Sequence, residues 1–174
     1  VVDERINVRG EIRHPLDVTE AESVVDQLLD EGVEAIAICL LNSFANPHHE
    51  HQIRDIVKSR APNMLCCISH DVLPEIKEYE RTSTTVINTY VLPIVARYLS
   101  SLRQGLDDKS ISAPLWLMQS NGGLTTSRDA SERPMNIIES GPAGGVIGAQ
   151  ALGKHLGLSD IITFDMGGTT AKAS

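Results

Sequence analysis

One segment near the end of the chain combines an acidic residue, two glycines and two hydroxyl residues in a pattern that suits phosphate binding. Asp165 ends an apolar run, Gly167 and Gly168 let the backbone turn sharply, and Thr169 and Thr170 follow. Backbone N–H groups and hydroxyls of such a loop can donate hydrogen bonds to phosphate oxygens, while the carboxylate holds Mg²⁺ directly or through water. The alternative is a plain β-hairpin whose glycines only shape the turn.

A second glycine-rich segment precedes this one. Ser140, Gly141, Gly144 and Gly145 lie where the sequence predicts a junction between a strand and a helix. N–H groups exposed at a helix N-terminus favour anions, so these residues are candidates for cofactor binding. The alternative is close packing of a helix with small residues against a neighbouring element.

A third polar turn, Gln119–Gly123, follows another predicted strand. Open α/β sheets place ligands at the ends of their strands. Asn121 and Gly122 are therefore added to the candidate cofactor-binding residues.

Other polar residues carry weaker signals. His48, His49 and His51 crowd one predicted helix start, but neighbouring positions do not converge on one face as metal ligands at i and i+4 do, so a solvated helix end is predicted. The charged residues between Glu75 and Arg81 are predicted to form a solvated or inter-lobe face.

The first part of the chain alternates between helical and strand patterns. Thr19 and Glu22 predict a capping box for a helix that ends near Gly32, and residues 33–41 form a nearly continuous apolar run, as in a strand covered on both faces. A helix starting at Asn46-Pro47 and a strand at 64–68 are predicted next. This order implies crossovers onto a mostly parallel sheet.

The rest of the chain begins with a long helical pattern from Thr82 to Gly105, in which Pro93 is predicted to produce a kink or a break. Its length makes it a candidate bridge between two lobes. The further predicted elements are strands at 114–119 and 136–139, a helix ending near Gly157, and two strands at 161–165 and 169–172 that flank the glycine turn.

Composition sets the class of protein. The 174 residues suit one domain or two small lobes, and 41% hydrophobic against 22% charged residues is typical of a soluble globular protein. The net charge of −8 argues against a nucleic-acid binder, and no apolar run is long enough for a membrane span. Cys39, Cys66 and Cys67 are interpreted as small buried residues in a reduced, cytoplasmic protein.

Four motifs together resemble the hydantoinase A/5-oxoprolinase family, which includes N-methylhydantoinases, 5-oxoprolinases and acetone-carboxylase subunits. In chain order they are Leu73–Thr85, Met118–Gly123, Glu139–Ala149 and Asp165–Thr170. The resemblance covers nearly the whole chain. It implies an α/β fold with a mostly parallel or mixed sheet, flanking helices and ribonuclease-H-like lobes of the actin, sugar-kinase and Hsp70 type.

The resemblance also implies a function. Members of this family use ATP and Mg²⁺ to activate a cyclic amide or carbonyl substrate by phosphorylating its oxygen, often with a hydantoinase B-type partner. Carried onto this chain, Gly167, Gly168, Thr169 and Thr170 would form the second phosphate loop, with Asp165 as the catalytic residue near Mg²⁺. Self-association into a homo-oligomer is left open.

The resemblance divides the chain into three parts: 1–81 as the end of a first lobe, 82–105 as the connecting helix, and 106–174 as the start of a second lobe. No Asp-x-Gly-Gly-Thr loop precedes Asp165, the first residue is not Met, and Lys172 stands where many relatives have an acid. We therefore expect an internal fragment that is inactive alone. The alternatives are a non-enzymatic regulatory or assembly lobe, a small-molecule kinase and an ATP-dependent carboxylase subunit.

Overall fold

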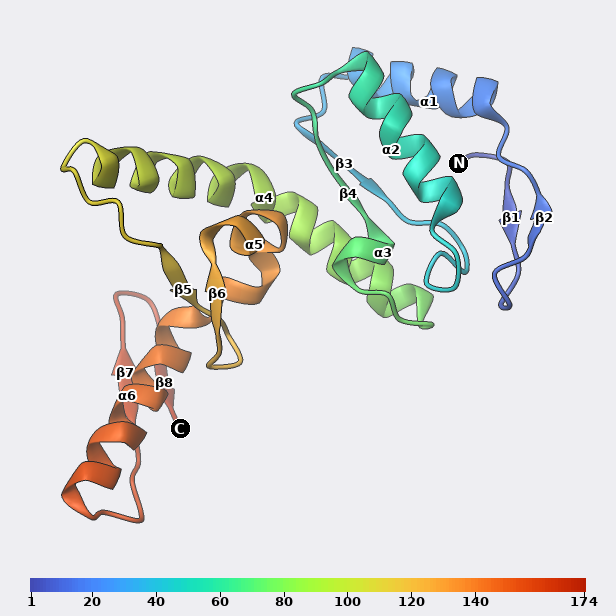
Figure 1. Ribbon diagram of the computed structural model, residues 1–174. Coiled ribbons are helices and arrows are strands. Elements are labelled where there is room, and N and C mark those ends of the chain that lie inside the picture. Colours follow the sequence, from blue (N-terminus) through green and yellow to red (C-terminus); the bar gives the residue numbers. More distant parts are fainter. The chain divides into compact units, whose positions relative to one another are not determined.

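The computed structural model describes residues 1–174, which divide into two compact units, Val1–Val95 and Ala96–Ser174. Figure 1 shows the elements in chain order. The elements of the first unit are β1 (Arg5–Ile6), β2 (Ile12–His14), α1 (Val18–Asp30), β3 (Ala35–Ile38), α2 (His48–Arg60), β4 (Leu65–Ile68) and α3 (Ser69–Val72). Helix α4 (Glu78–Asp107) begins in this unit and continues into the second.

A parallel strand–helix–strand arrangement is the centre of the first unit. Strand β3 pairs with β4 in parallel, from Ala35 opposite Leu65 to Ile38 opposite Ile68, and α2 provides the crossover. The predicted order of helix, strand, helix and strand is confirmed. Helix α1 is capped by Asp17, whose carboxylate accepts a hydrogen bond from the Glu20 N–H at 3.0 Å. The predicted capping box at Thr19 is therefore wrong, because Asp17 is an equally suitable cap one position before the first helical residue.

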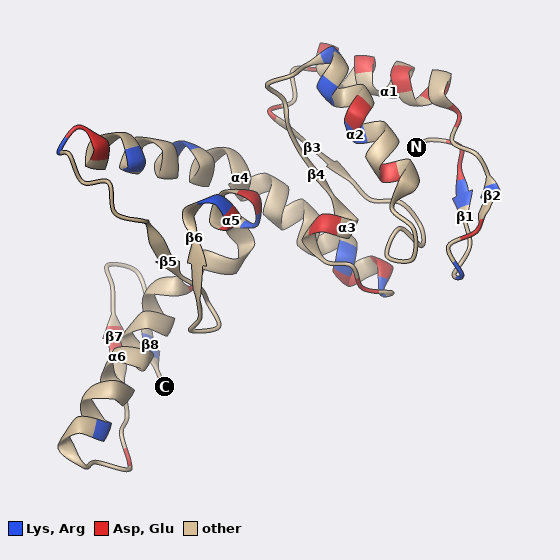
Figure 2. Cartoon of the chain, in the orientation of Figure 1, with Lys and Arg blue, Asp and Glu red and all other residues tan.

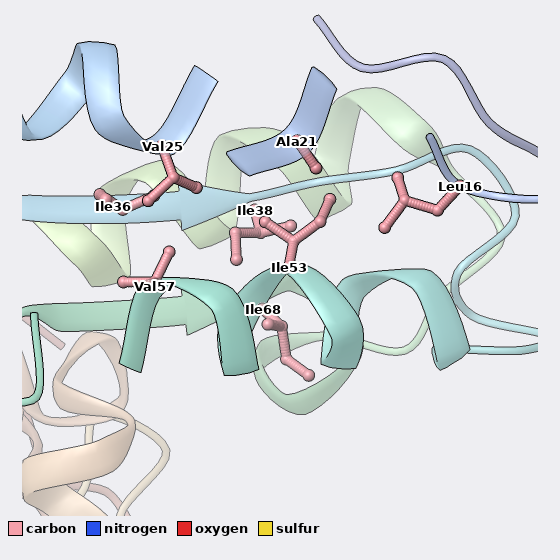
Figure 3. Packing of buried hydrophobic residues seen from close by; sticks show 8 residues of the cluster. All are labelled: Leu16, Ala21, Val25, Ile36, Ile38, Ile53, Val57 and Ile68. Atoms are coloured by element: carbon pink, nitrogen blue, oxygen red, sulfur yellow. The ribbon is translucent and has the colours of Figure 1, made fainter. Parts of the chain in front are cut away.

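The hydrophobic core of this unit lies between α1, α2 and one face of the two parallel strands (Figure 3). Ile36 and Ile38 point into it, whereas Ala37 on the other face of β3 is exposed. The predicted burial of both strand faces is thus not seen. The core side chains are Leu16, Ala21, Val25, Ile36, Ile38, Ile53, Val57 and Ile68.

The chain is a mixed α/β protein, as predicted, but its strands form small two-stranded sheets rather than one mostly parallel or mixed sheet. The structure has four separate two-stranded sheets, of which only β3–β4 is parallel. A parallel pair needs a crossover of a dozen residues or more, and α2 supplies one. The other three pairs are joined by short turns, which produce antiparallel hairpins.

A buried polar network joins the ends of β3 and β4. Glu50 on α2, which is fully buried, accepts hydrogen bonds from the Leu40 N–H at 2.9 Å, from the Ser69 hydroxyl at 2.6 Å and from the His70 N–H at 3.0 Å. Arg81 at the start of α4 is 1% exposed and donates to Ser69 Oγ at 3.1 Å. The predicted solvated face is therefore wrong for Arg81, whose charge is balanced through Ser69 by that of Glu50.

A buried hydrogen bond corrects the interpretation of the histidines. His49 lies 2.8 Å from the Glu4 carboxylate through Nδ1, and both side chains are almost completely buried. The predicted solvated helix end therefore fails at His49, which attaches the N-terminal segment to α2.

Cys66 on β4 provides a test of the environment around the parallel strands. Burial raises the pKa of its thiol to about 12, with the neighbouring Cys67 as a smaller cause. The reactive thiolate is therefore scarce at neutral pH. We expect Cys66 in the native protein to react with iodoacetamide at pH 8 roughly 10³-fold more slowly than free cysteine. Peptide mass spectrometry after timed alkylation measures this rate; equal rates in native and urea-unfolded protein would contradict it.

Helix α4 is longer than predicted and unbroken. It begins at Glu78 rather than Thr82, and Pro93 lies inside it without ending it. The helical turns before and after Pro93 belong to the same helix. The helices of this chain, α4 included, lack the apolar length that a bilayer crossing requires.

The second unit consists of two hairpins and three short or medium helices. Its elements after α4 are β5 (Trp116–Met118), β6 (Leu124–Thr126), α5 (Ser127–Glu132), the 3₁₀ helix η1 (Pro134–Ile137), α6 (Ser140–Leu156), β7 (Phe164–Met166) and β8 (Ala171–Ala173). The predicted strand at 136–139 is wrong. The β-branched Ile137 and Ile138 favour a strand, but Pro134 fixes a helical φ at the first position of η1.

Candidate functional site

The hairpin β7–β8 has the predicted order of strand, glycine turn and strand. Asp165 lies directly opposite Lys172 in the antiparallel register. The Gly167 N–H donates to the Thr170 carbonyl at 2.9 Å and closes the turn. The acidic residue is thus held by strand pairing one position before Met166, at the turn end of β7.

The polar groups of this hairpin are free to bind a ligand. The Asp165 carboxylate and the hydroxyls of Thr169 and Thr170 are exposed and make no hydrogen bond within the chain. A Cβ added at Gly168 would meet no atom within 4 Å, so the backbone is open there. A phosphate could therefore approach the N–H groups of this turn closely.

A cavity of about 310 Å³ lies between the hairpin and the first half of α6. Asp165 and Lys172 line it from the strands, and Gly145 lines it from the helix. Two of the three predicted segments thus each place a candidate residue, Asp165 and Gly145, at this cavity. The predicted phosphate-binding residues of the turn do not line it: Gly167, Gly168, Thr169 and Thr170. The other lining residues of the cavity are Pro142, Val146, Ala149, Ile162, Thr163, Phe164 and Ser174.

The glycine-rich segment 140–145 forms the first turns of α6. The residue before this helix is Glu139, and the element before it is the 3₁₀ helix η1. The predicted junction between a strand and a helix is therefore wrong. A Cβ at Gly144 would lie 3.7 Å from Met118 Cγ, which agrees with the close-packing alternative at that position. A Cβ at Gly141 or Gly145 would meet nothing within 4 Å, so these two backbones stay open to a ligand. Ser140 begins the helix and does not line the cavity.

The third predicted segment shapes a turn that packs on α6. Asn121 Oδ1 accepts from the Gly123 N–H at 2.8 Å, and the Ser120 hydroxyl accepts from the Glu139 N–H at 3.0 Å. Gly122 has φ +84°, and a Cβ there would lie 2.9 Å from Ile147 Cδ1. Neither Asn121 nor Gly122 lines the cavity beside Asp165.

Substitution of Gly122 tests this packing. Gly122→Ala is expected to destabilise the second unit by about 1–2 kcal/mol, because a Cβ strains a residue with positive φ. Gly148→Ala is the matched control, because it lies inside α6 with no atom within 4 Å of the new Cβ and should stabilise by up to about 1 kcal/mol. Urea unfolding followed by fluorescence of Trp116, the single tryptophan, measures both. Equal effects of the two substitutions would contradict the packing.

The structure adds Glu139, which was not predicted to be a site residue. The Lys172 ammonium forms an ion pair with the Glu139 carboxylate at the start of α6. Lys172 therefore lies between two acids, Glu139 and its cross-strand neighbour Asp165. Figure 2 shows the acidic segment of β7 beside the basic segment of β8, while most of α6 is uncharged. In the sequence, the only sign of the Lys172–Glu139 ion pair is the position of Glu139 directly before the glycine-rich segment.

The donor set suits a magnesium ion that reaches the protein with phosphate. No group of three or more His, Cys, Asp or Glu side chains is placed to hold a metal ion by itself. Mg²⁺ usually keeps several waters and is bound by one or two carboxylates together with substrate phosphates. Asp165, with an unengaged carboxylate beside an open glycine turn, fits that mode.

Comparisons with known proteins agree with the sequence motifs. The hydantoinase/oxoprolinase family matches residues 81–174, and the hydantoinase/oxoprolinase N-terminal region matches residues 1–61. An uncharacterised protein of Methanocaldococcus jannaschii is 43% identical over 173 residues, which are 99% of this chain and 25% of that protein. Caprolactamase subunit alpha of Pseudomonas jessenii is 36% identical over 166 residues, 95% of this chain and 24% of the relative.

A solved structure agrees with the fold over the full chain. Nucleotide-free acetone carboxylase, from a study of ATP-dependent acetone carboxylation, superposes with a TM-score of 0.90 at 32% identity. The match covers 99% of this chain and 25% of that one. The chain thus spans about a quarter of the length of the relatives that it matches.

Proposed function

Because the chain belongs to the hydantoinase/oxoprolinase family, we propose that it contributes the phosphate-binding part of an ATP-dependent enzyme that opens a cyclic amide. One observation carries the proposal: Asp165, Lys172 and the open backbone of Gly145 line a single cavity. An acidic and a basic side chain at one cavity suit a metal-bound polyphosphate, because the acid can hold the metal and the ammonium can neutralise phosphate charge.

Each group has a distinct task in this proposal. The N–H groups of the Gly167–Thr170 turn donate to phosphate oxygens, and Asp165 holds Mg²⁺ directly or through water. Lys172 neutralises phosphate charge when it leaves Glu139. Bound ATP supplies the phosphoryl group that activates the amide carbonyl oxygen. The residues of this chain act by positioning and charge neutralisation, on which phosphoryl transfer mainly depends.

The same proposal assigns roles to the parts of the chain. Residues 1–81 are the end of one ribonuclease-H-like lobe, 82–105 connect the lobes, and 106–174 begin the second lobe. The chain spans about a quarter of the length of its relatives, and we propose that the rest of the nucleotide site lies outside residues 1–174. A hydantoinase B-type subunit or domain is the partner, in keeping with the name of the caprolactamase alpha subunit as one of several.

ATP-dependent carboxylation is a second candidate, favoured by the TM-score of 0.90 with acetone carboxylase. Both reactions start by activating a carbonyl oxygen with ATP. They differ in what then attacks: water opens a ring amide, whereas a carboxylase joins the activated substrate to carbon dioxide or bicarbonate.

The products of the full-length protein test the proposal. Incubation with Mg-ATP and hydantoin is expected to give ADP and the ring-opened acid, resolved by liquid chromatography and mass spectrometry. Accumulation of a phosphorylated ring would instead indicate a kinase, and bicarbonate-dependent carboxylation of a ketone a carboxylase. The absence of ATP turnover with every substrate would favour a non-enzymatic lobe. Residues 1–174 alone are expected to hydrolyse no ATP above a heat-inactivated control.

A further inference from the structure

A second, separate cavity of about 240 Å³ lies in the same unit and is lined entirely by polar residues. It is smaller than the ~300–1,000 Å³ of sites for drug-sized ligands, so it suits a small molecule. The lining residues are Gln119, Thr125, Asp129, Glu132, Arg133 and Asn136. None of them belongs to the hairpin that contains Asp165.

The two amide residues of this cavity project from backbone that is fixed on both sides. The Gln119 N–H donates to the Gly123 carbonyl at 2.8 Å, and the Gln119 carbonyl accepts from the Gly122 N–H at 3.0 Å. The Asn136 carbonyl accepts from the Ser120 N–H at 2.7 Å. Both side chains are therefore carried by a rigid frame, which lowers the entropy cost of binding.

These side chains have unused hydrogen-bonding capacity. The amides of Gln119 and Asn136 and the guanidinium of Arg133 make no hydrogen bond or ion pair within the chain. Asp129 uses one carboxylate oxygen to accept from the Thr126 hydroxyl at 2.8 Å, which leaves the other free. Gln119 and Asn136 are half-buried and Arg133 is exposed, so these three polar groups are available to a ligand that enters the cavity.

The chemistry of a primary amide selects one class of ligand. Ring closure forces a cyclic amide into the cis form, so that its N–H and C=O point to the same side. An Asn or Gln side chain offers one donor and one acceptor in the matching arrangement, and the two amides can form a reciprocal pair of hydrogen bonds. An open-chain secondary amide is trans and cannot form that pair.

We propose that this cavity binds the ring amide of the substrate, with Asn136 pairing to its cis amide and with Gln119 and Arg133 donating to carbonyl oxygens of the ring. The free oxygen of Asp129 accepts from a second ring N–H where the ring has one. This assignment rests on the proposed function, because the cyclic-amide class comes from there. It adds the residues that recognise the ring and separates them from the phosphate-binding hairpin.

Calorimetric titration of hydantoin into the full-length protein, without nucleotide, tests the assignment. Asn136→Leu, which removes the amide at similar size, is expected to weaken hydantoin binding about tenfold or more, and Gln119→Leu likewise. Gln150→Leu on the exposed part of α6 is the matched control and should bind like the parent. Asn136→Asp keeps the shape of the side chain and removes the NH₂ donor. It replaces Asn136→Leu in the titration if circular dichroism shows that Asn136→Leu does not fold.

The choice of ligand gives an independent readout. 1,3-Dimethylhydantoin has the same ring but no N–H, and it is expected to bind at least tenfold more weakly than hydantoin. Equal binding of the two rings, unchanged binding in the Asn136 and Gln119 variants, or no binding of hydantoin at all would each overturn the assignment. Because no ATP is present, Asp165→Asn should bind hydantoin normally. ATP turnover without hydantoin binding would therefore reject this inference and leave the proposed use of ATP intact.

Discussion

Replacing Asp165 by asparagine is expected to lower the ATP turnover of the full-length protein on the order of 10²–10³-fold. The side chain keeps its size on β7 opposite Lys172, so the hairpin register is preserved. What is lost is the negative charge that we propose holds Mg²⁺ beside the glycine turn. Steady-state ADP formation at saturating Mg-ATP measures the effect, and calorimetric titration of Mg-ATP measures the accompanying loss of affinity.

Asp160→Asn is the control for the Asp165 substitution. Asp160 is exposed, lies in the segment before β7 and does not line the cavity, so this variant should turn over ATP like the parent. Raising Mg²⁺ should partly restore Mg-ATP affinity in Asp165→Asn, because the remaining donors still contact the ion weakly. Unchanged turnover and affinity in Asp165→Asn would reject Asp165 as the metal-binding acid of this site.

Replacing Arg81 by methionine is expected to destabilise the first unit by about 3–5 kcal/mol. Arg81 also donates to the carbonyls of Glu75 at 2.7 Å and Leu40 at 2.8 Å. Its removal leaves these acceptors without their donor and leaves the fully buried Glu50 carboxylate without a balancing charge. The loss approaches the whole stability of a small domain, which is typically 5–15 kcal/mol.

Hydrogen exchange in the β3 and β4 peptides, read by mass spectrometry, reports the stability of this unit separately from the other. Arg13→Met is the matched control, because the Arg13–Glu11 ion pair is mostly exposed and should contribute less than about 1 kcal/mol. Arg81→Lys keeps the charge but not the three-way donation and should lie between the two. A loss below 1 kcal/mol in Arg81→Met would contradict the structural role of the network.

The local patterns of the sequence predicted the elements on which the candidate site depends. The end of α6 follows from Gly157, which has the positive φ of a helix C-cap, and the β7–β8 turn follows from adjacent glycines after an apolar strand. Such signals depend only on a few neighbouring residues. They therefore predict the local structure correctly, whatever tertiary contacts the rest of the chain makes.

The errors arose where distant residues decide the outcome. Arg81 has the composition of a surface residue, and only its approach to Ser69 and Leu40 buries it. Residues 136–139 have strand propensity, but the helical turn that begins at Pro134 continues into them, and the Asn136 carbonyl accepts from the Ser120 N–H of a separate turn. Gly144 was interpreted as a phosphate-binding glycine. Its packing against Met118 depends on how a separate hairpin lies on α6, which the local sequence does not reveal.

The strand pairs of the chain differ in the length of chain that each must close. Three pairs are hairpins that join near neighbours such as Met166 and Ala171, and hairpins form in about 1–10 μs. The β3–β4 pair instead joins Ala35 to Leu65, and its pairing requires the intervening chain, α2 included, to cross over. Loop closure of this length carries the larger entropy cost. The crossover will therefore set the folding rate of the first unit, and substitutions at Ile53 or Val57 of α2 will slow folding where changes in the hairpins do not.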